Sequence, residues 1–386
     1  MRRPLTLFTA TTFLLEVQFW FPVWLLFLLD LGFGLPTAML ADAAFRLISV
    51  ALEIPMGILA DRLGRKRTYL TIALLTAVSF ILIAFITSTV TLFVAWAVWG
   101  VLWALNSGTA SAYAYELTAP MGPMTGQRAF AGIRGAGQAA VLLSLVTAGI
   151  LFAVDPRLPF LVTALMALVA ALLILGLPDT SNDSPTDIPV SRILPTISML
   201  KAWPVVLLGV LFFSYGWSVQ ILVQPLALDL GIPPEATGFM YAGMALAGMS
   251  TTFLAGWIPR RLVHSAPVWA LALTAAGCTG TWVAPELAPY MWLPIISAAW
   301  GLGWTALEFA VSSATPSAMR ATTLSIIAGL GGLVIAVSRP TLGLLSDAFD
   351  SAHAYGVWAL VGLGLFLLVS LVAFVHRPRR AADSPR

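Results

Sequence analysis

Gly57-Ile-Leu-Ala-Asp61-Arg62-Leu-Gly64-Arg65-Lys66-Arg67 joins the second and third long apolar runs of the chain, 37–60 and 68–87. Each run is long enough to cross a bilayer, because a transmembrane helix needs about 20 apolar residues. The glycine at position 64 permits a tight turn, and clustered basic residues favour the cytoplasmic side of a membrane. The segment therefore predicts a short cytoplasmic hairpin between two transmembrane helices.

The same alternation of long apolar runs and short polar loops continues along the chain. Of 386 residues, 59% are hydrophobic and 10% are charged, whereas a soluble protein carries about 25% charged residues. Twelve apolar runs are bounded by charges, Pro or Gly, from 5–29, interpreted as a retained first span, to 354–375. We therefore expect an all-α polytopic membrane protein with twelve transmembrane helices.

The positions of Lys and Arg predict the orientation. With the N-terminus placed inside, Arg157 is the sole basic residue outside, three arginines (Arg46, Arg134 and Arg339) fall within spans, and the rest of the 20 basic residues lie inside. Such an excess marks the cytoplasmic side, so both termini are expected in the cytoplasm. The net charge of +3 follows from this topology and does not predict nucleic-acid binding.

The longest polar stretch, Pro178 to Lys201, has the composition of a linker, with the sequence Asp179-Thr-Ser-Asn-Asp-Ser-Pro-Thr-Asp-Ile-Pro189, and falls midway along the chain. It predicts four parts: an N-terminal six-helix bundle at 1–177, a cytoplasmic linker at 178–202, a C-terminal six-helix bundle at 203–376 and a cytoplasmic tail at 377–386. Gly100-Val-Leu-Trp-Ala-Leu resembles Gly301-Leu-Gly-Trp-Thr-Ala-Leu, and Arg128-Ala resembles Arg320-Ala. Such spacing is typical of two pseudo-symmetric bundles related by an axis along the membrane normal.

The hairpin segment matches the pattern G-x-x-x-D-R-x-G-R-[RK] at every fixed position and resembles the signature loop of the major facilitator superfamily (MFS). The fourth and fifth spans look like the bacterial efflux-like branch of that family. The resemblance implies a transporter whose two bundles rock about a site near the bilayer midplane. The second half departs from it, because Gly256-Trp-Ile-Pro-Arg-Arg carries no Asp. The fifth span also lacks the G-P-x-x-G-G signature of many drug/proton antiporters.

The family resemblance also implies a cytoplasmic latch. A carboxylate at the C-terminal end of a helix opposes the helix dipole and needs a partner; in the family the aspartate matching Asp61 meets the start of the eleventh helix. Glu116 matches the acidic partner of the arginine at position 65. The predicted latch comprises Gly57, Asp61, Arg62, Gly64, Arg65, Lys66, Glu116 and Arg134. The alternative is that these charges only enforce topology.

Nothing in the sequence predicts an enzyme or an ATP-driven pump. Neither lysine, Lys66 or Lys201, follows the glycines of a phosphate loop, and no catalytic trio, paired catalytic carboxylates or metal-ligand spacing occurs. We expect no metal and no cofactor, with a proton gradient as the energy source. Charge within a span is costly and usually functional, which makes Glu16 and Glu308 the candidate proton carriers. A structural role for each is the alternative.

The candidate proton and substrate site is drawn from polar and aromatic residues on the spans expected to line the cavity: Glu16, Gln18, Trp20, Asn106, Tyr113, Gln138, Tyr215, Gln220, Trp304 and Glu308. The aromatic residues could equally serve only for packing. Asp42 and Arg46 are spaced to neutralise one another at i and i+4, as structural charges. Arg339, the remaining intramembrane charge, could meet Asp42, form an outer gate or extend to the interface.

The function expected is secondary active transport by alternating access, with proton-coupled export of hydrophobic or amphipathic small molecules. Uptake or facilitated transport of a specific small metabolite is the alternative, and a non-transporting receptor with the same fold is a third. The expected partners are a small-molecule substrate, protons and the lipid of a bacterial inner membrane, and the expected active form is a monomer.

Overall fold

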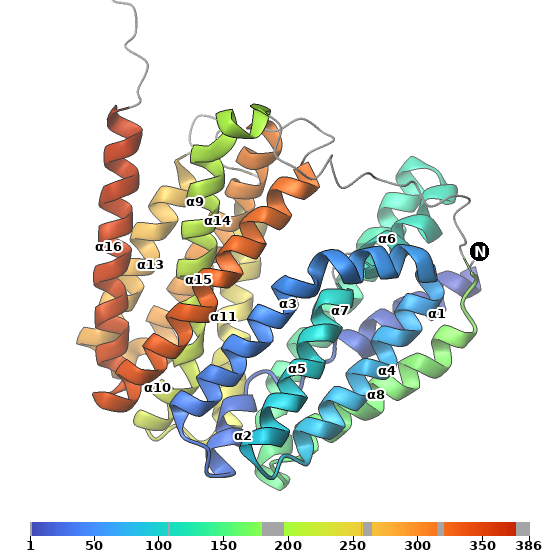
Figure 1. The fold of residues 1–386 in the computed structure, drawn as a ribbon, viewed down its shortest axis with the longest axis horizontal. Helices are drawn as coiled ribbons and strands as arrows, with labels where there is room; N and C mark the ends of the chain where they lie inside the picture. The colour runs from blue at the N-terminus through green and yellow to red at the C-terminus, as the bar shows by residue number, and fades with distance from the viewer. Residues whose placement is uncertain are drawn as a thin grey trace, which may run out of the picture. The chain divides into compact units, whose positions relative to one another are not determined.

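The computed structural model describes residues 2–106, 109–179, 197–255, 257, 265–314 and 320–375. Its elements are helical throughout these ranges, and they gather into two compact units (Figure 1). Nine helices of the described part are long and apolar enough to cross a membrane. Each of the twelve predicted spans corresponds to one helix or to a broken pair of helices, as expected for an all-α polytopic membrane protein.

The first unit holds Met1–Arg192 together with two later stretches, Ile221–Gly243 and Gly332–Ala348. Its first eight helices are α1 (Arg2–Glu16), α2 (Trp24–Asp30), α3 (Leu35–Leu63), α4 (Arg65–Ala84), α5 (Thr89–Asn106), α6 (Thr109–Thr118), α7 (Pro123–Val154) and α8 (Leu158–Leu175), with a 3-10 turn η1 (Ala119–Met121) between α6 and α7. The later stretches add α10 (Val223–Asp229), the N-terminal part of α11 (Pro234–Ala255) and the C-terminal part of α15 (Arg320–Ala348).

The second unit holds Ile193–Gln220, Met244–Gly331 and Phe349–Arg386. Its elements are α9 (Ile197–Val219), α11 (Pro234–Ala255), α13 (Ala266–Val283), η4 (Pro285–Leu287), η5 (Ala288–Trp292), α14 (Leu293–Ala314), α15 (Arg320–Ala348) and α16 (Ser351–Val375); α11 and α15 each contribute one end to the first unit, and η3 (Gln220–Leu222) joins α9 to α10. Helix α9 begins before the predicted bundle boundary at 203, so the helix takes in the end of the predicted linker.

The first predicted span, 5–29, is not continuous. Helix α1 ends at Glu16 and α2 begins at Trp24, and the chain between them turns through short backbone hydrogen bonds such as that from the Phe21 N–H to the Gln18 carbonyl (3.1 Å). Pro22 explains the break, because it has no N–H to donate to a carbonyl one turn back. Interrupted spans are typical of ligand sites in transporters.

The seventh span is interrupted at the corresponding place. A 3-10 turn, η3, separates α9 from α10 before Pro225. Both interrupted spans then end in the same sequence, Leu29-Asp-Leu-Gly32 and Leu228-Asp-Leu-Gly231, with positive φ angles of 85° and 66° at the two glycines. In each turn the residue after the glycine donates to the carbonyl five positions back, at 3.0 and 2.8 Å, which is a Schellman cap. This repeat strengthens the internal symmetry between the halves.

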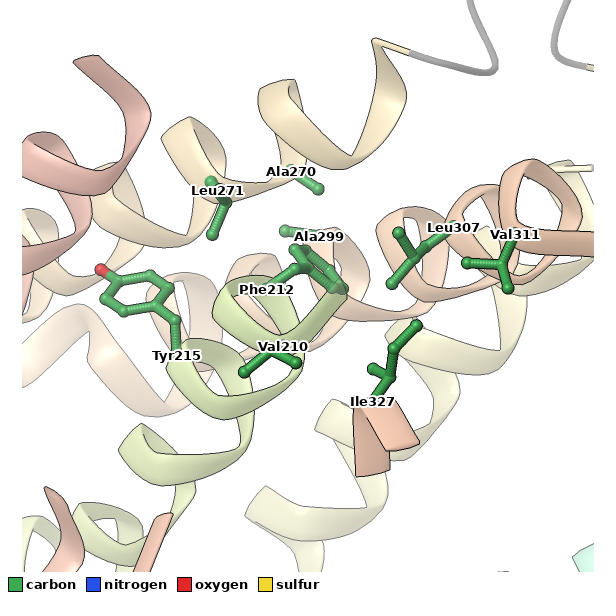
Figure 2. Packing of buried hydrophobic residues seen from close by; sticks show 9 residues of the cluster. All are labelled: Val210, Phe212, Tyr215, Ala270, Leu271, Ala299, Leu307, Val311 and Ile327. Atoms are coloured by element: carbon green, nitrogen blue, oxygen red, sulfur yellow. The ribbon is translucent and has the colours of Figure 1, made fainter. Parts of the chain in front are cut away.

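The second unit is held together by a cluster of apolar side chains from α9, α13, α14 and α15 (Figure 2). Its buried members are Val210, Phe212, Tyr215, Ala270, Leu271, Ala299, Leu307, Val311 and Ile327. Cys278, the chain's single cysteine, is also fully buried, 4.0 Å from the Tyr215 hydroxyl. The cluster fixes the relative positions of the helices that carry the second unit's aromatic residues.

In the first unit, glycines let α7 and the start of α11 approach closely. A Cβ added at Gly149 would overlap the Pro234 carbonyl oxygen, and one added at Gly238 would overlap the Leu145 carbonyl oxygen. Small residues at such crossings allow backbone-to-backbone packing in membranes. The start of the eighth span is therefore part of the first unit.

Candidate functional site

Glu16 ends α1 at the break in the first span. The side chain is half-buried, and its Oε2 atom lies 3.5 Å from the Gln18 amide nitrogen. Gly137 of α7 packs against it, since an added Cβ would lie 3.3 Å from the Glu16 Cγ atom. Arg134, one turn earlier on α7, acts electrostatically on the carboxylate. The carboxylate therefore lies between an opposing helix dipole and an attracting arginine.

Arg134 was predicted as part of the cytoplasmic latch, and the structure adds its electrostatic contact with Glu16. Helix α7 begins at Pro123 rather than at 129, so Arg134 lies about three turns into the helix and nearer the middle of the membrane. Its charged neighbour in the described structure is Glu16.

Four aromatic side chains on α9 and α14 of the second unit pack against one another, and we call this group the aromatic wall. Trp300 and Trp304 on α14 stack with ring centroids 5.8 Å apart and planes 2° from parallel. Trp217 of α9 lies 5.6 Å from Trp300, and Phe213 lies 5.3 Å from Trp304. The Trp304 side chain hydrogen-bonds to Glu308, one turn further along the same face. The wall therefore consists of four aromatic rings and ends at a carboxylate.

The first unit contains the matching tryptophans, Trp99 and Trp103, in a different arrangement. Trp99 is 7% exposed and packs edge-on against Trp20 at 4.6 Å. Phe45 stacks on its other side at 4.3 Å, and Trp103 lies 6.4 Å away at 87°. Trp103 is 43% exposed. Trp20 and Trp99 are core residues here, and of the matched pair only Trp103 offers an indole face.

The intramembrane charges of the first unit pair differently from the sequence prediction. Asp42 forms its ion pair with Arg339, with 2.8 Å between Oδ2 and Nη1, and both side chains are buried. This confirms the first alternative for Arg339 and replaces the predicted pair of Asp42 with Arg46. Instead, the Arg46 guanidinium lies over the rings of Phe45 (5.1 Å) and Trp103 (6.0 Å).

Gln224 of α10 fastens the two interrupted spans together within the first unit. Its Oε1 atom accepts from the backbone N–H groups of Leu25 (3.0 Å) and Leu26 (3.2 Å), in the first turn of α2. Its amide nitrogen donates to the Phe21 carbonyl at 3.2 Å. The side chain is 2% exposed. A single amide thus satisfies backbone groups that the break leaves without helical partners.

The predicted hairpin pair is present: the Arg65 Nε atom lies 2.9 Å from the Glu116 Oε1 atom. Gly64 has a φ of 80°, as expected for the turn between α3 and α4. A Cβ added at Gly57 would meet nothing within 4 Å, so no described helix approaches Gly57 closely. Arg62 is exposed, and the Asp61 side chain lies outside the described residues.

The hairpin also contacts the end of the first unit's last helix. Lys66 Nζ donates to the Leu175 carbonyl at 2.8 Å, and the Tyr113 hydroxyl donates to the Pro178 carbonyl. Helix α4 therefore contacts the end of α8, and α6 contacts the start of the predicted linker.

Two tyrosines predicted for the site lie in the core instead. Tyr113 is fully buried against Phe8 and Tyr69. Tyr215 stacks on Trp358 at 5.4 Å and donates to its carbonyl. Both hydroxyls donate to backbone carbonyls, so the polar end of each tyrosine is satisfied within the apolar core.

The amides predicted for the site lie at helix breaks or on exposed faces. Asn106 is exposed at the end of α5, Gln138 is exposed on α7, and Gln220 is half-buried in η3. The contacts of Gln224, and the Ser144 hydroxyl that accepts from the Gln18 backbone at 3.1 Å, were not predicted. The repeated Leu-Asp-Leu-Gly turns and the prolines before them are the signal that marks these breaks.

Comparison with known proteins agrees with this architecture. A family model described as Major Facilitator Superfamily matches residues 6–338. No curated protein matches the chain. Among solved structures, a point mutant of the nucleoside transporter NupG has a TM-score of 0.79 at 14% identity, covering 95% of this chain and 99% of its own.

Two further solved structures have similar folds. A bacterial homologue of the human lysosomal transporter Spinster, in an inward-facing and occupied conformation, has a TM-score of 0.73 at 14% identity, with 98% of each chain covered. The human organic anion transporter MFSD10 has a TM-score of 0.61 at 15% identity, covering 95% of this chain and 99% of that one. At these identities the likeness concerns the fold.

Proposed function

Because the chain belongs to the major facilitator superfamily and is a multi-pass membrane transporter, we propose that it exports hydrophobic or amphipathic small molecules in exchange for protons. The proposal places it as a monomer in a bacterial inner membrane, with both termini in the cytoplasm and no cofactor. Two bundles alternate access to a site near the bilayer midplane. The proton gradient supplies the energy.

The observation that carries the proposal is the aromatic wall of Trp217, Trp300, Trp304 and Phe213. Parallel indoles offer a flat apolar surface to a flat substrate, and ligand pockets combine such surfaces with a few polar groups. Glu308 supplies one polar group where the wall ends. A substrate with an aromatic body fits this pattern better than a sugar or a small ion.

Glu16 is the proposed principal proton carrier. A carboxylate in a membrane span is costly to keep charged, and this one sits at the end of a helix, where the dipole opposes negative charge. Arg134 favours the charged form, so protonation would weaken their attraction and loosen α1 from α7. Binding and release of a proton would thereby change the break in the first span.

The latch residues are proposed to stabilise the cytoplasm-closed state. Arg65 and Glu116 hold the α3–α4 hairpin against α6, and Asp61 with Arg62 would complete the contact. Loss of Glu116 should therefore shift the balance toward the cytoplasm-open state rather than abolish substrate binding.

The test is transport in proteoliposomes with an imposed proton gradient and a panel of probes: tetraphenylphosphonium, naphthalene-2-sulfonamide, naphthalene-2-sulfonate and adenosine. We expect uphill movement of an aromatic probe against a matching proton flux. Glu16→Gln should abolish uphill movement while keeping exchange of the probe across the membrane. Glu286→Gln, an exposed glutamate in η4, is the matched control and should behave as wild type. Uphill transport by Glu16→Gln would remove Glu16 from the coupling role.

Uptake or facilitated passage of one metabolite is the second candidate. Two of the solved structures with similar folds are of the nucleoside transporter NupG, and a nucleobase is a flat ring that also stacks on indole. Movement of adenosine alone, down its gradient and without a proton flux, would favour this function over export.

A further inference from the structure

The charges around Arg46 do not balance. Asp42 is already bound to Arg339 at 2.8 Å, and the two side chains are 5% and 8% exposed. Arg46 lies one turn after Asp42 on α3, and the charges that act on it are the Arg339 guanidinium and the Asp42 carboxylate. Among the described residues, the charges at Arg46 are therefore two guanidinium groups and one carboxylate, which leaves a net positive charge around it.

The hydrogen bonding of Arg46 is also incomplete. Its Nε atom is buried and has no hydrogen-bond partner in the part of the chain that the structure describes. The guanidinium is held over Phe45 and Trp103 by cation–π contacts at 5.1 and 6.0 Å. Such contacts are weaker than the charged hydrogen bonds that normally accompany a buried arginine. The Arg46 guanidinium therefore keeps a buried donor that an anionic group could satisfy.

An aromatic surface lies beside the guanidinium. Trp103 is 43% exposed, although its helix neighbours Leu102 and Ala104 are buried. Arg46 lies about 16 Å along α3 from its first residue, and Trp103 about 21 Å along α5, at 1.5 Å per residue. With each helix start taken as the edge of a hydrocarbon layer about 30 Å thick, Arg46 lies near the midplane and Trp103 about two thirds of the way across. Transporters of this kind hold their substrates near the midplane.

We propose that Arg46 and Trp103 form a subsite for an aromatic organic anion, a flat ring bearing a carboxylate or sulfonate. The anionic group accepts hydrogen bonds from the Arg46 guanidinium, and the ring lies against the Trp103 indole. The inference names the substrate class of the proposed exporter and so rests on that function. It gives the first unit a role in substrate recognition.

The site is not explained by structural packing alone. The Nε atom of Arg46 is buried and has no hydrogen-bond partner among the described residues, whereas an arginine that only packs on aromatic rings in an exposed position can satisfy its donors with water. Arg157, which lies 5.6 Å over the Phe85 ring in an exposed position, is such a case. It provides a matched control with the same arginine-on-ring contact and no neighbouring ion pair among the described residues.

The test is equilibrium binding of two matched probes, naphthalene-2-sulfonate and naphthalene-2-sulfonamide, to the purified full-length protein by titration calorimetry. They share the ring and differ in charge. We expect the sulfonate to bind about tenfold to a hundredfold more tightly, the range of one or two charged hydrogen bonds. Equal binding of the two probes by the wild type would overturn the proposal without any variant.

The variants assign the preference to its residues. Arg46→Gln should bring sulfonate affinity down to that of the sulfonamide, Arg46→Lys should keep part of the preference, and Arg157→Gln should leave it intact. Trp103→Ala should weaken both probes by a similar factor. Retention of the full preference in a folded Arg46→Gln protein would place the anion elsewhere. Because binding needs no proton gradient, failed proton coupling with intact charge preference would disprove the export mechanism alone.

Discussion

The sequence Trp-Gly-x-x-Trp occurs twice, at Trp99–Trp103 and at Trp300–Trp304, and the two copies serve different purposes. In the first unit, Trp99 is enclosed by Trp20 and Phe45. In the second, the two indoles stack in parallel and remain half-buried. The spacing within the motif is identical, so the neighbouring aromatic side chains decide whether a tryptophan pair becomes core or surface.

The same contrast holds for the charges. In the first unit, Arg46 and Trp103 stand beside a closed ion pair, whereas the wall of the second unit ends at a carboxylate. The two halves thus share the backbone breaks and the glycines, while their polar groups differ. Symmetry of fold does not imply symmetry of chemistry, and comparing equivalent positions separates the two.

The largest expected difference is in stability, between the variants Trp99→Ala and Trp304→Ala. Truncating Trp99 opens a cavity in a closed aromatic core and should lower the free energy of unfolding by about 3–5 kcal/mol. Trp304 is only partly buried, so Trp304→Ala should lower the free energy of unfolding by clearly less. Unfolding in one detergent, followed by tryptophan fluorescence, measures both.

For transport activity we expect the opposite order, with the larger loss in Trp304→Ala than in Trp99→Ala. Trp304→Ala should reduce transport of the aromatic probes at least tenfold per folded protein, about 1.4 kcal/mol, because it removes half of the stacked pair. Equal stability losses in the two variants would contradict the assignment of Trp99 to the core and Trp304 to the wall.

The glycines inside the two motifs provide the next comparison. A Cβ at Gly301 would overlap the Gly248 carbonyl oxygen of α11, whereas one at Gly100 would lie 3.0 Å from Ile48 and the Phe45 carbonyl. We expect Gly301→Ala to lower stability by about 1–3 kcal/mol and Gly100→Ala by less, because overpacking is costly where backbone must move. The midpoints of thermal unfolding rank the two. The reverse order would mean that α14 and α11 can move apart at lower cost than α5 and α3.

The next comparison is between two glutamines of the interrupted seventh span, Gln224 in α10 and Gln220 in η3. Gln224→Leu leaves two α2 backbone N–H groups unsatisfied and should cost about 1–3 kcal/mol. Gln220 is half-buried, and no hydrogen bond of its side chain occurs within the described residues, so Gln220→Leu should cost less. Hydrogen exchange at Leu25 and Leu26 is the measurement. Unchanged protection in Gln224→Leu would show that the cap is dispensable.

The smallest effects concern the turns before the sixth and twelfth spans. Asp155 accepts from the Arg157 N–H at 2.8 Å, and Asp350 accepts from the His353 N–H at 2.7 Å. Burial raises the pKa of Asp350, but the hydrogen bonds and charge of His353 outweigh it, so that the pKa lies below its usual value. Its stabilising contribution is therefore present above the unfolded pKa near 3.9 and is lost as the pH falls through the folded pKa.

Replacing Asp350 with Ala should lower stability at pH 7 by about 0.5 kcal/mol, the low end for a helix cap, because the side chain is 42% exposed. Asp350→Asn keeps the cap and should flatten the pH dependence below about pH 4. Unfolding midpoints between pH 3 and pH 7 check this. A loss of stability on acidification in Asp350→Asn equal to that of the wild type would assign the dependence to other groups.

Much of the fold follows from local sequence. The apolar runs predicted the spans, and the pair of Arg65 with Glu116 was predicted from the motif and is present. What could not be predicted depends on distant partners. Asp42 lies 297 positions before Arg339, so their pairing was predicted only as one of three alternatives for Arg339, and the nearer Arg46 was favoured for Asp42. Pro22 itself indicates a break in the first span, but the apolar run 5–29 continues through it, so a single continuous span was predicted.

The candidate site was predicted by residue type rather than by packing. Trp304 and Glu308 do come together, since they are one turn apart on a single helix. Tyr113 and Tyr215 were misplaced because a polar tip on an aromatic ring looks the same in sequence whether it faces a ligand or a backbone carbonyl. Burial, which decides between these roles, is a property of neighbouring helices.

The contacts of Lys66 with Leu175 and of Tyr113 with Pro178 make the start of the linker an attachment point for a reporter. Asp179 is exposed directly beyond them, and the native thiol of Cys278 is fully buried. A fluorophore on Asp179→Cys could therefore be attached selectively without removing the native cysteine. Tyr113 of α6 contacts Pro178, and Glu116 of α6 pairs with Arg65 of the hairpin. The emission would therefore follow the movement of the signature loop in real time.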